Sequence, residues 1–468
     1  MADTFAVGGS GTMANAIADN GGGYVSGSAA DWTTFQGPNG GALYTVIGAS
    51  YATATGVITK ADEFALGLTD ILVHTKEGAA GAWAEAWHPI TASNKDTITI
   101  ASGLGDNTDI DVWVGGAWPA TDVGIQAALD LVAAGDTIKI SNAGTHMLAA
   151  GLSTNAAVDA TADAPICCEG VNGATGVVLT KAETYPLLQA SGAMTNMFLI
   201  QSKHFCTKKL HFDGNGQTIA CGIQINEYYS YAESCLVEDV DTDGILMNWM
   251  GNMALYCEVW DVPGDGIEAE DNGQGVLFCS VHACVTGIRM GAADYGQQCI
   301  GNRSFNNTGD GILWRSFGGI CANNICDHNN RGVYIYSGTS ALFINNSCIN
   351  NTTYGYDFQA ANISWSFWGN NHANGNGTAH CNSCANEDWA SFLDGNNISG
   401  DPLFRGDYTD GDYYPLKGSP LLEVGWPNYA GYETDRDTIQ SFPTIGAFNR
   451  YAGGGLLTHP GMCGGIRG

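Results

Sequence analysis

The sequence predicts an all-β protein whose central part winds as a β-solenoid with about 22 residues in each coil. Two repeats with one shared period support this fold. The first is a glycine followed by an apolar residue, with steps of 22, 22, 21, 24, 21 and 23, at Gly222, Gly244, Gly266, Gly287, Gly311, Gly332 and Gly355. The second is a cysteine, with steps of 29, 22, 22, 20, 22 and 27, at Cys206, Cys235, Cys257, Cys279, Cys299, Cys321 and Cys348. Such a period is too short for paired-helix repeats and fits one solenoid coil.

The composition restricts the expected partners. The chain has 468 residues, with 47 acidic and 17 basic side chains and a formal net charge of −30. Nucleic acid and anionic membranes are not expected as partners, because binding them requires a basic surface. An acidic polysaccharide would be repelled at long range, although a local basic site could still bind one. The N-terminus has no recognisable signal peptide, and no stretch approaches the length of a membrane span.

Four segments are expected along the chain. Residues 1–48 are rich in Gly, Ala, Ser and Asn, which predicts an irregular N-terminal arm. Residues 49–118 contain β-type runs bounded by Gly, Asn and Asp, and predict a small antiparallel β-domain. A parallel β-helix is expected over residues 119–400, and residues 401–468 are expected to form a C-terminal closing segment.

A short amphipathic helix is expected immediately before the first coil. Ile125, Ala128, Leu129 and Val132 share one helical face, and the helix ends at Gly135, where a strand over residues 135–140 is expected to begin. An uncovered solenoid end would expose core side chains and unpaired strand edges. We therefore interpret this helix as a cap.

Asparagines and cysteines are expected to stack from coil to coil. Asn tolerates the left-handed backbone conformation of tight turns and can form stacked amide ladders. Pairs of asparagines occur at Asn306-Asn307, Asn323-Asn324, Asn329-Asn330, Asn345-Asn346 and Asn350-Asn351. The recurring cysteines would lie roughly 4.8 Å apart on adjacent coils. We expect them to be buried, reduced and chemically inert, although that distance also permits disulfides.

Three stretches resemble the right-handed parallel β-helix proteins of the pectate-lyase-like superfamily. They are the predicted cap and first strand over residues 125–140, the repeated Asp/Asn-Gly-Ile turns, and the motifs over residues 400–404, 414–420 and 445–448. The last resembles the closing segment of bacterial and phage β-helix proteins, including phage fibres and tailspikes. The resemblance implies a right-handed, single-stranded parallel β-helix. It does not imply one activity, because this fold hosts lyases, hydrolases, epimerases, adhesins and phage spikes.

Strand alternation places two columns of side chains on the outside of the β-helix. The first column is Gln224, Leu246, Glu268, Arg289, Leu313, Tyr334 and Asp357. The second column is Asn226, Asn248, Glu270, Gly291, Arg315, Tyr336 and Gln359. Because neighbours in a column lie about 4.8 Å apart, such a sheet can pair carboxylates from adjacent coils.

The acidic candidates for catalysis are Asp243, Asp265, Glu268 and Glu270. Two carboxylates about 5 Å apart could serve a retaining glycosidase, and a wider pair an inverting one. One carboxyl would need a raised pKa to act as an acid, and Arg289 could orient a sugar carboxylate. The alternative is structural: Asp before a turn glycine is favoured by backbone hydrogen bonding, and Glu268 beside Arg289 can be a cross-strand ion pair. The catalytic motifs of pectate lyases, polygalacturonases and alginate epimerases are absent from the sequence.

The sequence predicts no cofactor, with calcium as a weak alternative. Residues 239–244 imitate the start of a calcium loop, but Met250 stands where a bidentate Glu is needed, so we interpret them as a turn. Asp407, Asp410 and Asp412 are a second weak calcium candidate. A zinc site at His372, His380, Cys381 and Cys384 lacks a suitably spaced second pair of ligands.

The function predicted from the sequence is structural or adhesive: a virion protein of the phage head-fibre, decoration or tailspike type, at the virion surface or extracellular. Tyr334, Tyr336, Arg289 and Arg315 are the candidates for binding a cell-surface glycan. The N-terminal region would attach to other virion proteins, and a homo-oligomer, for example a trimer, is expected by analogy. The alternatives are a polysaccharide depolymerase, either a glycoside hydrolase or a lyase, and a bacterial surface adhesin.

Overall fold

A computed structural model describes most of the chain and divides it into two compact units. One unit comprises residues 1–193 and 201–212, and the other comprises residues 194–200 and 213–468. The described residues are 4–7, 16–17, 24–25, 44–52, 55–61, 72–77, 83–94, 96–100, 107–114, 122–142, 145–171, 178–180, 182–291, 295–336, 341–359, 366–382, 397–404, 413 and 419–421.

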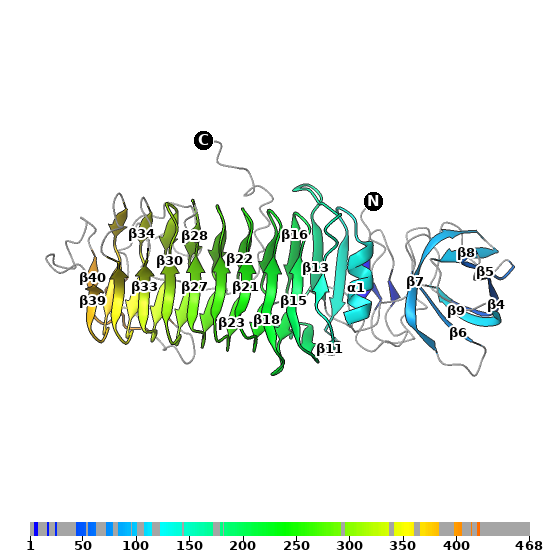
Figure 1. The fold of residues 1–468 in the computed structure, drawn as a ribbon, viewed down its shortest axis with the longest axis horizontal. Coiled ribbons are helices and arrows are strands. Elements are labelled where there is room, and N and C mark those ends of the chain that lie inside the picture. The colour runs from blue at the N-terminus through cyan, green and yellow to red at the C-terminus, as the bar shows by residue number, and fades with distance from the viewer. Residues whose placement is uncertain are drawn as a thin grey trace. The chain divides into compact units, whose positions relative to one another are not determined.

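The first unit contains a closed antiparallel β-barrel (Figure 1). Its strand order is β4-β5-β8-β7-β6-β9, and every pairing in it is antiparallel. The strands are β4 (Tyr44–Ala52), β5 (Val57–Thr59), β6 (Leu72–Glu77), β7 (Trp83–Ser93), β8 (Thr97–Ile100) and β9 (Asn107–Val114). Ile58, Ile98 and Ile110 are buried in the barrel. The barrel overlaps the stretch expected to form a small β-domain.

The first unit also contains parallel strands and one helix. Three short strands lie in the stretch expected to be an irregular arm: β1 (Thr4–Val7) pairs in parallel with β10, whereas β2 (Ala16–Ile17) and β3 (Tyr24–Val25) pair with each other. Parallel pairs continue from β10 to β13 and β16, and from β11 to β14. The remaining strands of this unit are β10 (Thr137–Ser141), β11 (Thr145–Leu148), β12 (Leu152–Ser153), β13 (Ile166–Val171), β14 (Leu187–Ala190), β16 (Phe205–Lys208) and β17 (His211–Asp213).

Helix α1 (Asp122–Leu131) precedes β10, as the sequence predicts. Its predicted apolar face is buried, with Ile125, Ala128, Leu129 and Val132 all at most 3% exposed. Polar side chains attach the helix to the neighbouring strands: a carboxylate oxygen of Asp122 accepts hydrogen bonds from two backbone N–H groups after β11, and the Gln126 amide exchanges two hydrogen bonds with the Ser153 backbone. The helix therefore covers this end of the parallel strands.

The second unit is a parallel β-solenoid, so the predicted fold class is confirmed (Figure 1). Each coil contributes one strand to each of three parallel sheets. The first sheet contains β19 (Tyr231–Glu233), β22 (Met253–Leu255), β25 (Gly275–Leu277), β28 (Gln298–Ile300), β31 (Ile320–Ala322), β34 (Leu342–Ile344) and β37 (Phe367–Gly369). The second contains β20 (Leu236–Glu238), β23 (Glu258–Trp260), β26 (Ser280–His282), β29 (Arg303–Phe305), β32 (Ile325–Asp327), β35 (Ser347–Ile349), β38 (His372–Asn374) and β40 (Ile398–Ser399).

The third sheet carries the candidate site. Its strands are β15 (Met194–Ile200), β18 (Ile219–Ile225), β21 (Asp243–Met247), β24 (Asp265–Ala269), β27 (Thr286–Met290), β30 (Asp310–Trp314), β33 (Arg331–Ile335), β36 (Tyr354–Phe358) and β39 (Ala379–Asn382). The residue after each repeated glycine, which is Ile, Val or in one case Tyr356, points into the core, and Ile245, Ile267 and Ile288 are fully buried.

The repeated glycines lie where a side chain would collide with the solenoid interior. A Cβ on Gly266 would be 2.3 Å from Cγ1 of Val281 and 2.7 Å from the backbone oxygen of Gly287 on the next coil. A Cβ on Gly244 would collide with the Val259 side chain and the Gly266 backbone oxygen in the same way. Close approach of the backbone, repeated once per coil, therefore explains the glycine ladder.

The seven cysteines are all buried, but they do not form one continuous column. Cys206 belongs to the first unit and pairs with Cys167. In the second unit, Cys235, Cys257 and Cys279 occupy the corner between the first two sheets, Cys299 pairs with Cys321 in the first sheet, and Cys348 pairs with Cys326 in the second. The short step of 20 residues after Cys279 marks this change of place. Twelve of the described cysteines are free thiols, whereas Cys381 is disulfide-bonded.

Two internal asparagine ladders continue the solenoid corners, as the paired asparagines predict. At one corner, Nδ2 of Asn302 donates to Oδ1 of Asn324, and Asn324 donates to Asn346, at 3.0 and 2.9 Å. The second ladder runs through Asn307, Asn329, Asn351 and Asn376. The first member of most pairs has a positive φ, as at Asn323 with 56°, and the second member is stacked. Four of the five doublets thus provide both the turn and the ladder, whereas at Asn329-Asn330 the positive φ belongs to His328 and Asn329 is the stacked residue.

Little of the expected closing segment is described. Tyr413 is buried and donates a hydrogen bond from its hydroxyl to the Asp327 carboxylate, and its ring lies edge-on to Phe305 of the second sheet. The resembling motif over residues 445–448 lies outside the described residues. Within the described part of the chain, no helix has the length and apolar character needed to cross a membrane.

Candidate functional site

The outer face of the third sheet presents side chains in the predicted register. Glu268 pairs with Leu246 on one side and Arg289 on the other, and Tyr334 pairs with Leu313 and Asp357. A further outward column, which the sequence analysis did not define, contains the residue before each glycine. Its members include Asp243, Asp265, Thr286, Asp310, Arg331 and Tyr354.

The inward-pointing glycine brings two of these columns together. In a regular strand, residues three apart face opposite sides of the sheet. In β24, however, Gly266 and Ile267 are both directed inward, so that Asp265 and Glu268 both present their carboxylates on the outer face. The same local geometry recurs in each coil of this sheet that carries the glycine. The glycine ladder therefore builds the site as well as the core.

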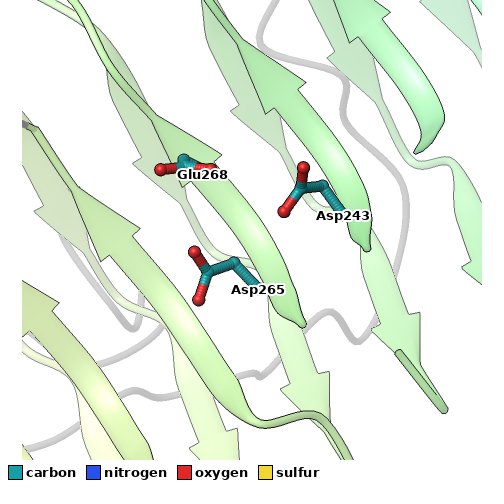
Figure 2. Close-up of side chains that lie close together, drawn as sticks. All are labelled: Asp243, Asp265 and Glu268. Carbon is teal, nitrogen blue, oxygen red and sulfur yellow. The ribbon is translucent and has the colours of Figure 1, made fainter. Parts of the chain in front are cut away.

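Three of the four predicted acidic residues converge. One carboxylate oxygen each from Asp243, Asp265 and Glu268 lies within 4.8 Å of the other two, as Figure 2 shows for the side chains on β21 and β24. Nη1 of Arg289 lies 2.8 Å from Oε1 of Glu268 and 3.1 Å from Oδ2 of Asp265. Glu270 is half-buried and lies outside this triad, although its charge acts on Glu268 and Asp243.

Burial and mutual repulsion shift the titration of this cluster. Desolvation raises the pKa of Glu268 to about 8, and the neighbouring carboxylates add to this rise against the opposing charge of Arg289. Desolvation and Asp265 raise the pKa of Asp243 to about 6. Four carboxyl groups share a single guanidinium, so the fully ionised cluster would have a formal charge of −3. The cluster therefore retains a proton near neutral pH.

A second network on the same face has fewer carboxylates for its arginine than the cluster around Arg289 has. Arg331 donates two hydrogen bonds to Asp310, at 2.6 and 3.0 Å, and one of 3.0 Å to Asp357. Its guanidinium carbon lies 3.4 Å from the centre of the Tyr334 ring. Sequence reasoning missed Asp310 and Arg331, although both occupy the column that precedes the repeated glycine. Because one arginine is enclosed by two carboxylates and an aromatic ring, this network is suited to holding three coils together.

Two further glycan-binding candidates, Arg315 and Tyr336, directly follow strands β30 and β33 and belong to one column. Tyr336 is 42% exposed, and the Arg315 guanidinium lies 4.7 Å from the centre of its ring. The Tyr334 and Tyr336 rings lie edge to face with centres 6.0 Å apart. An exposed aromatic ring with a polar edge is a surface on which a sugar ring can stack.

The weaker metal candidates that the structure describes take part in other interactions, except His380, whose Nδ1 is buried without a hydrogen-bond partner. Asp239 and Asp241 accept hydrogen bonds from the backbone N–H groups of Gly216 and Ile219, as expected for a turn. His372 is buried between the Ser347 hydroxyl and the Gly400 carbonyl. The disulfide at Cys381 leaves no thiolate there for zinc. Cys384, Asp407, Asp410 and Asp412 lie outside the described residues.

Among the described residues, the triad is the one group of at least three His, Cys, Asp or Glu side chains whose ligand atoms lie within 4.8 Å of one another. Carboxylate oxygens are the ligands that Ca²⁺ and Mg²⁺ prefer. A cation there would compete with Arg289, which already contacts two of the three carboxylates. The same arrangement can also perform acid-base chemistry, because it combines a protonated carboxyl with an ionised one.

No protein-family model and no curated protein matches the chain. Similar solved structures include a PL6 family polysaccharide lyase from Pseudopedobacter saltans, at 14% identity and a TM-score of 0.37, covering 56% of this chain and 76% of that chain. Pectate lyase Pel9A shows 11% identity and a TM-score of 0.39, with coverage of 69% and 90%. The enzymatically active domain of tailspike protein 2 of bacteriophage CBA120 shows 10% identity and a TM-score of 0.42, with coverage of 72% and 50%.

These similarities concern the architecture alone. The strand pairing of the chain itself defines its class: a parallel β-helix protein with a carboxylate cluster on the outer face of one sheet.

Proposed function

We propose that the protein is a polysaccharide depolymerase, specifically a glycoside hydrolase acting through Glu268 and Asp265. The observation that carries this proposal is the convergence of three carboxylates within 4.8 Å around a single arginine. The structural network around Arg331 sets two carboxylates, Asp310 and Asp357, against one guanidinium, and its formal charge is −1. The cluster around Arg289 keeps excess negative charge, and perturbed carboxyl groups of this kind favour a functional site. This imbalance, which the sequence alone does not show, favours an enzyme over a purely structural protein.

Glu268 is the proposed general acid. Its raised pKa leaves it protonated at neutral pH, so that it can donate its proton to the oxygen of the glycosidic bond as that bond breaks. Asp243, whose charge helps to raise that pKa, is the proposed positioning residue for this proton. Asp265, which Arg289 contacts at 3.1 Å, is the proposed ionised partner.

One carboxylate oxygen of Asp265 lies within 4.8 Å of one of Glu268, and this short spacing favours a retaining mechanism. Retaining enzymes separate their two carboxyl groups by about 5–5.5 Å, whereas inverting enzymes leave about 6.5–9.5 Å for a water molecule. Asp265 would attack the anomeric carbon while the glycosidic oxygen leaves with the Glu268 proton. Water would then break the resulting ester and return a proton to Glu268. The net change is one C–O bond broken and one water consumed.

The test is release of reducing ends from bacterial surface polysaccharides by the full-length protein. Glu268→Gln and Asp265→Asn should each lower the rate at least about a hundredfold, which is typical for loss of acid-base or nucleophilic groups. Glu258→Gln is the matched control, because Glu258 lies on the second sheet with 47% of its side chain exposed. Equal activity of all four proteins would refute the assignment.

A second candidate function is glycan binding on a virion without cleavage. The exposed Tyr336 ring beside Arg315 favours it, since both can contact sugar independently of the triad. Under this proposal the protein stands on the virion surface, attached to other virion proteins through its N-terminal region, as a homo-oligomer such as a trimer. Mass spectrometry of purified virions tests the location, and native mass spectrometry tests the oligomer. Glycan binding by Glu268→Gln with no turnover by the unaltered protein would favour this candidate.

A further inference from the structure

The outward columns of the third sheet carry few cations. In the described residues of the three columns, the basic side chains are Arg289, Arg315 and Arg331, and neither Lys nor His occurs. All three arginines already have partners. Arg331 is held by Asp310 and Asp357, and Arg315 lies against the Tyr336 ring.

Arg289 is the only one of these arginines at the triad, and its charge is already engaged. Its Nη1 contacts Glu268 and Asp265 together, and its side chain is 26% exposed. A uronate carboxylate placed here would meet further negative charges from Asp243 and Glu270. Like charges a few ångströms apart repel each other more strongly at a protein surface than in bulk water, because the effective dielectric constant there is lower. The net charge of −30 also repels an anionic polymer at longer range.

The next cation along the face is too far away to compensate. Arg315 lies two coils beyond Glu268 in the register Glu268, Arg289, Leu313. This places it about 9.6 Å along the sheet, taking roughly 4.8 Å per coil. An ion pair requires contact within about 4 Å. Among the described residues of these three columns, a sugar positioned for cleavage at the triad therefore meets no cation that lacks a carboxylate or aromatic partner.

The two ways of cutting a polysaccharide make different demands on such a site. Elimination from a uronate removes the proton next to the sugar carboxylate, expels the glycosidic oxygen, consumes no water and leaves a carbon–carbon double bond. It requires a cation to neutralise that carboxylate and a base to take the proton. Hydrolysis requires a proton donor at the leaving oxygen and an ionised carboxylate, which are the groups that Glu268 and Asp265 supply.

We infer that the sugar bound at the triad is uncharged, so that the substrate is a neutral, hydroxyl-rich polysaccharide and not a polyuronate. This inference rests on the proposed function for the location of the cleavage site. Two observations support it: Arg289 and Arg331 are each already paired with carboxylates, and carboxylates are in excess around the triad. Hydroxyl groups can donate hydrogen bonds to these carboxylates, whereas the ionised carboxylate of a uronate has no proton to donate and repels them.

Binding tests the inference separately from catalysis. Glu268→Gln, which should not degrade the polymer, is run by affinity electrophoresis through gels containing a neutral bacterial polysaccharide or a polyuronate such as pectate or alginate. We expect retardation by the neutral polymer at least tenfold stronger than by the polyuronate. Equal or stronger retardation by the polyuronate, or retardation by neither polymer, would overturn the inference.

A double variant tests the physical cause. Asp265→Asn with Glu268→Gln removes both partners of Arg289, which should then become available to a uronate, and polyuronate retardation should rise at least tenfold. Glu258→Gln serves as the matched control, and circular dichroism verifies the fold of each variant. No gain in the double variant would show that the charge of Arg289 does not control selection and would overturn the argument.

The unaltered protein completes the test with and without added Ca²⁺. Reducing ends without unsaturated product are expected from the neutral polymer. Unsaturated product from the polyuronate, with or without Ca²⁺, would overturn the inference. Absence of cleavage on every polymer would refute the proposed hydrolase, while the binding comparison would still decide which sugar the site accepts.

Discussion

Asp265 and Glu268 are three residues apart in β24, yet both carry their carboxylates on the outer face, because Gly266 between them points into the solenoid. The glycine that permits the backbone of one coil to approach the next also sets the geometry of the acidic triad. Stability and the candidate site therefore depend on the same residue.

Gly266→Ala should destabilise the solenoid. Its Cβ would lie 2.3 Å from the Val281 side chain and 2.7 Å from the Gly287 oxygen. Overpacking of a core typically costs about 1–3 kcal/mol, and contact with backbone has little room to relax. Urea denaturation measures the loss. Gly192→Ala is the control, because its Cβ would meet its nearest neighbour at 3.4 Å. Equal stability of the two variants would contradict the collision argument.

Asn324→Leu should lower the free energy of unfolding by about 2 kcal/mol or more. The Asn324 amide accepts from Asn302 and donates to Asn346 and to the Cys299 carbonyl, all inside the core. Each buried polar group that loses its partner costs about 1–3 kcal/mol.

The matched asparagine is Asn226, which lies on the outer face and makes one side-chain hydrogen bond, to Asn248. Asn226→Ala should cost less than about 1 kcal/mol, because water can replace the lost partner. Similar losses at both positions, measured by thermal or urea unfolding, would argue against the ladder as a source of stability.

Glu268→Gln should stabilise the protein most at alkaline pH. The folded state holds the pKa of Glu268 at about 8, above the ordinary value of 4.5, so it binds more protons than the unfolded state between these values. Stability of the unaltered protein consequently falls as pH rises through this window, and the variant lacks that loss. Melting temperatures should coincide near pH 4 and diverge in favour of the variant by pH 9. A constant difference across this range would contradict the raised pKa.

Activity should fall as pH rises through about 8, because Glu268 must be protonated to act as the acid. The pH dependence of kcat/KM for the unaltered protein measures this limb. Asp243→Asn removes one of the charges that raise the pKa, so its alkaline limb should shift to lower pH. A pH profile unchanged by this substitution would show that Asp243 does not raise the pKa of the general acid.

The local repeats made much of the fold predictable. The glycine ladder and the alternation after it yield the correct register for the column from Gln224 to Asp357. The asparagine doublets predict the turns and the stacked amides. These features can be read directly because each coil must repeat the conformation of the one before it. The cysteine ladder was less informative, because a small apolar thiol fits several interior positions. Cys206 consequently lies in the first unit, and the other six members lie in three separate stacks of the second unit.

The sequence by itself determined the period, the parallel architecture and the four acidic residues that stand near one another on the outer face. Only the tertiary structure decided which of these carboxylates converge, that Arg289 is shared by two of them, and that Asp310 and Asp357 enclose Arg331. The reason is physical. Backbone pairing follows from local patterns repeated along the chain, whereas protonation and ion pairing depend on burial and on distances of a few ångströms between side chains of different coils.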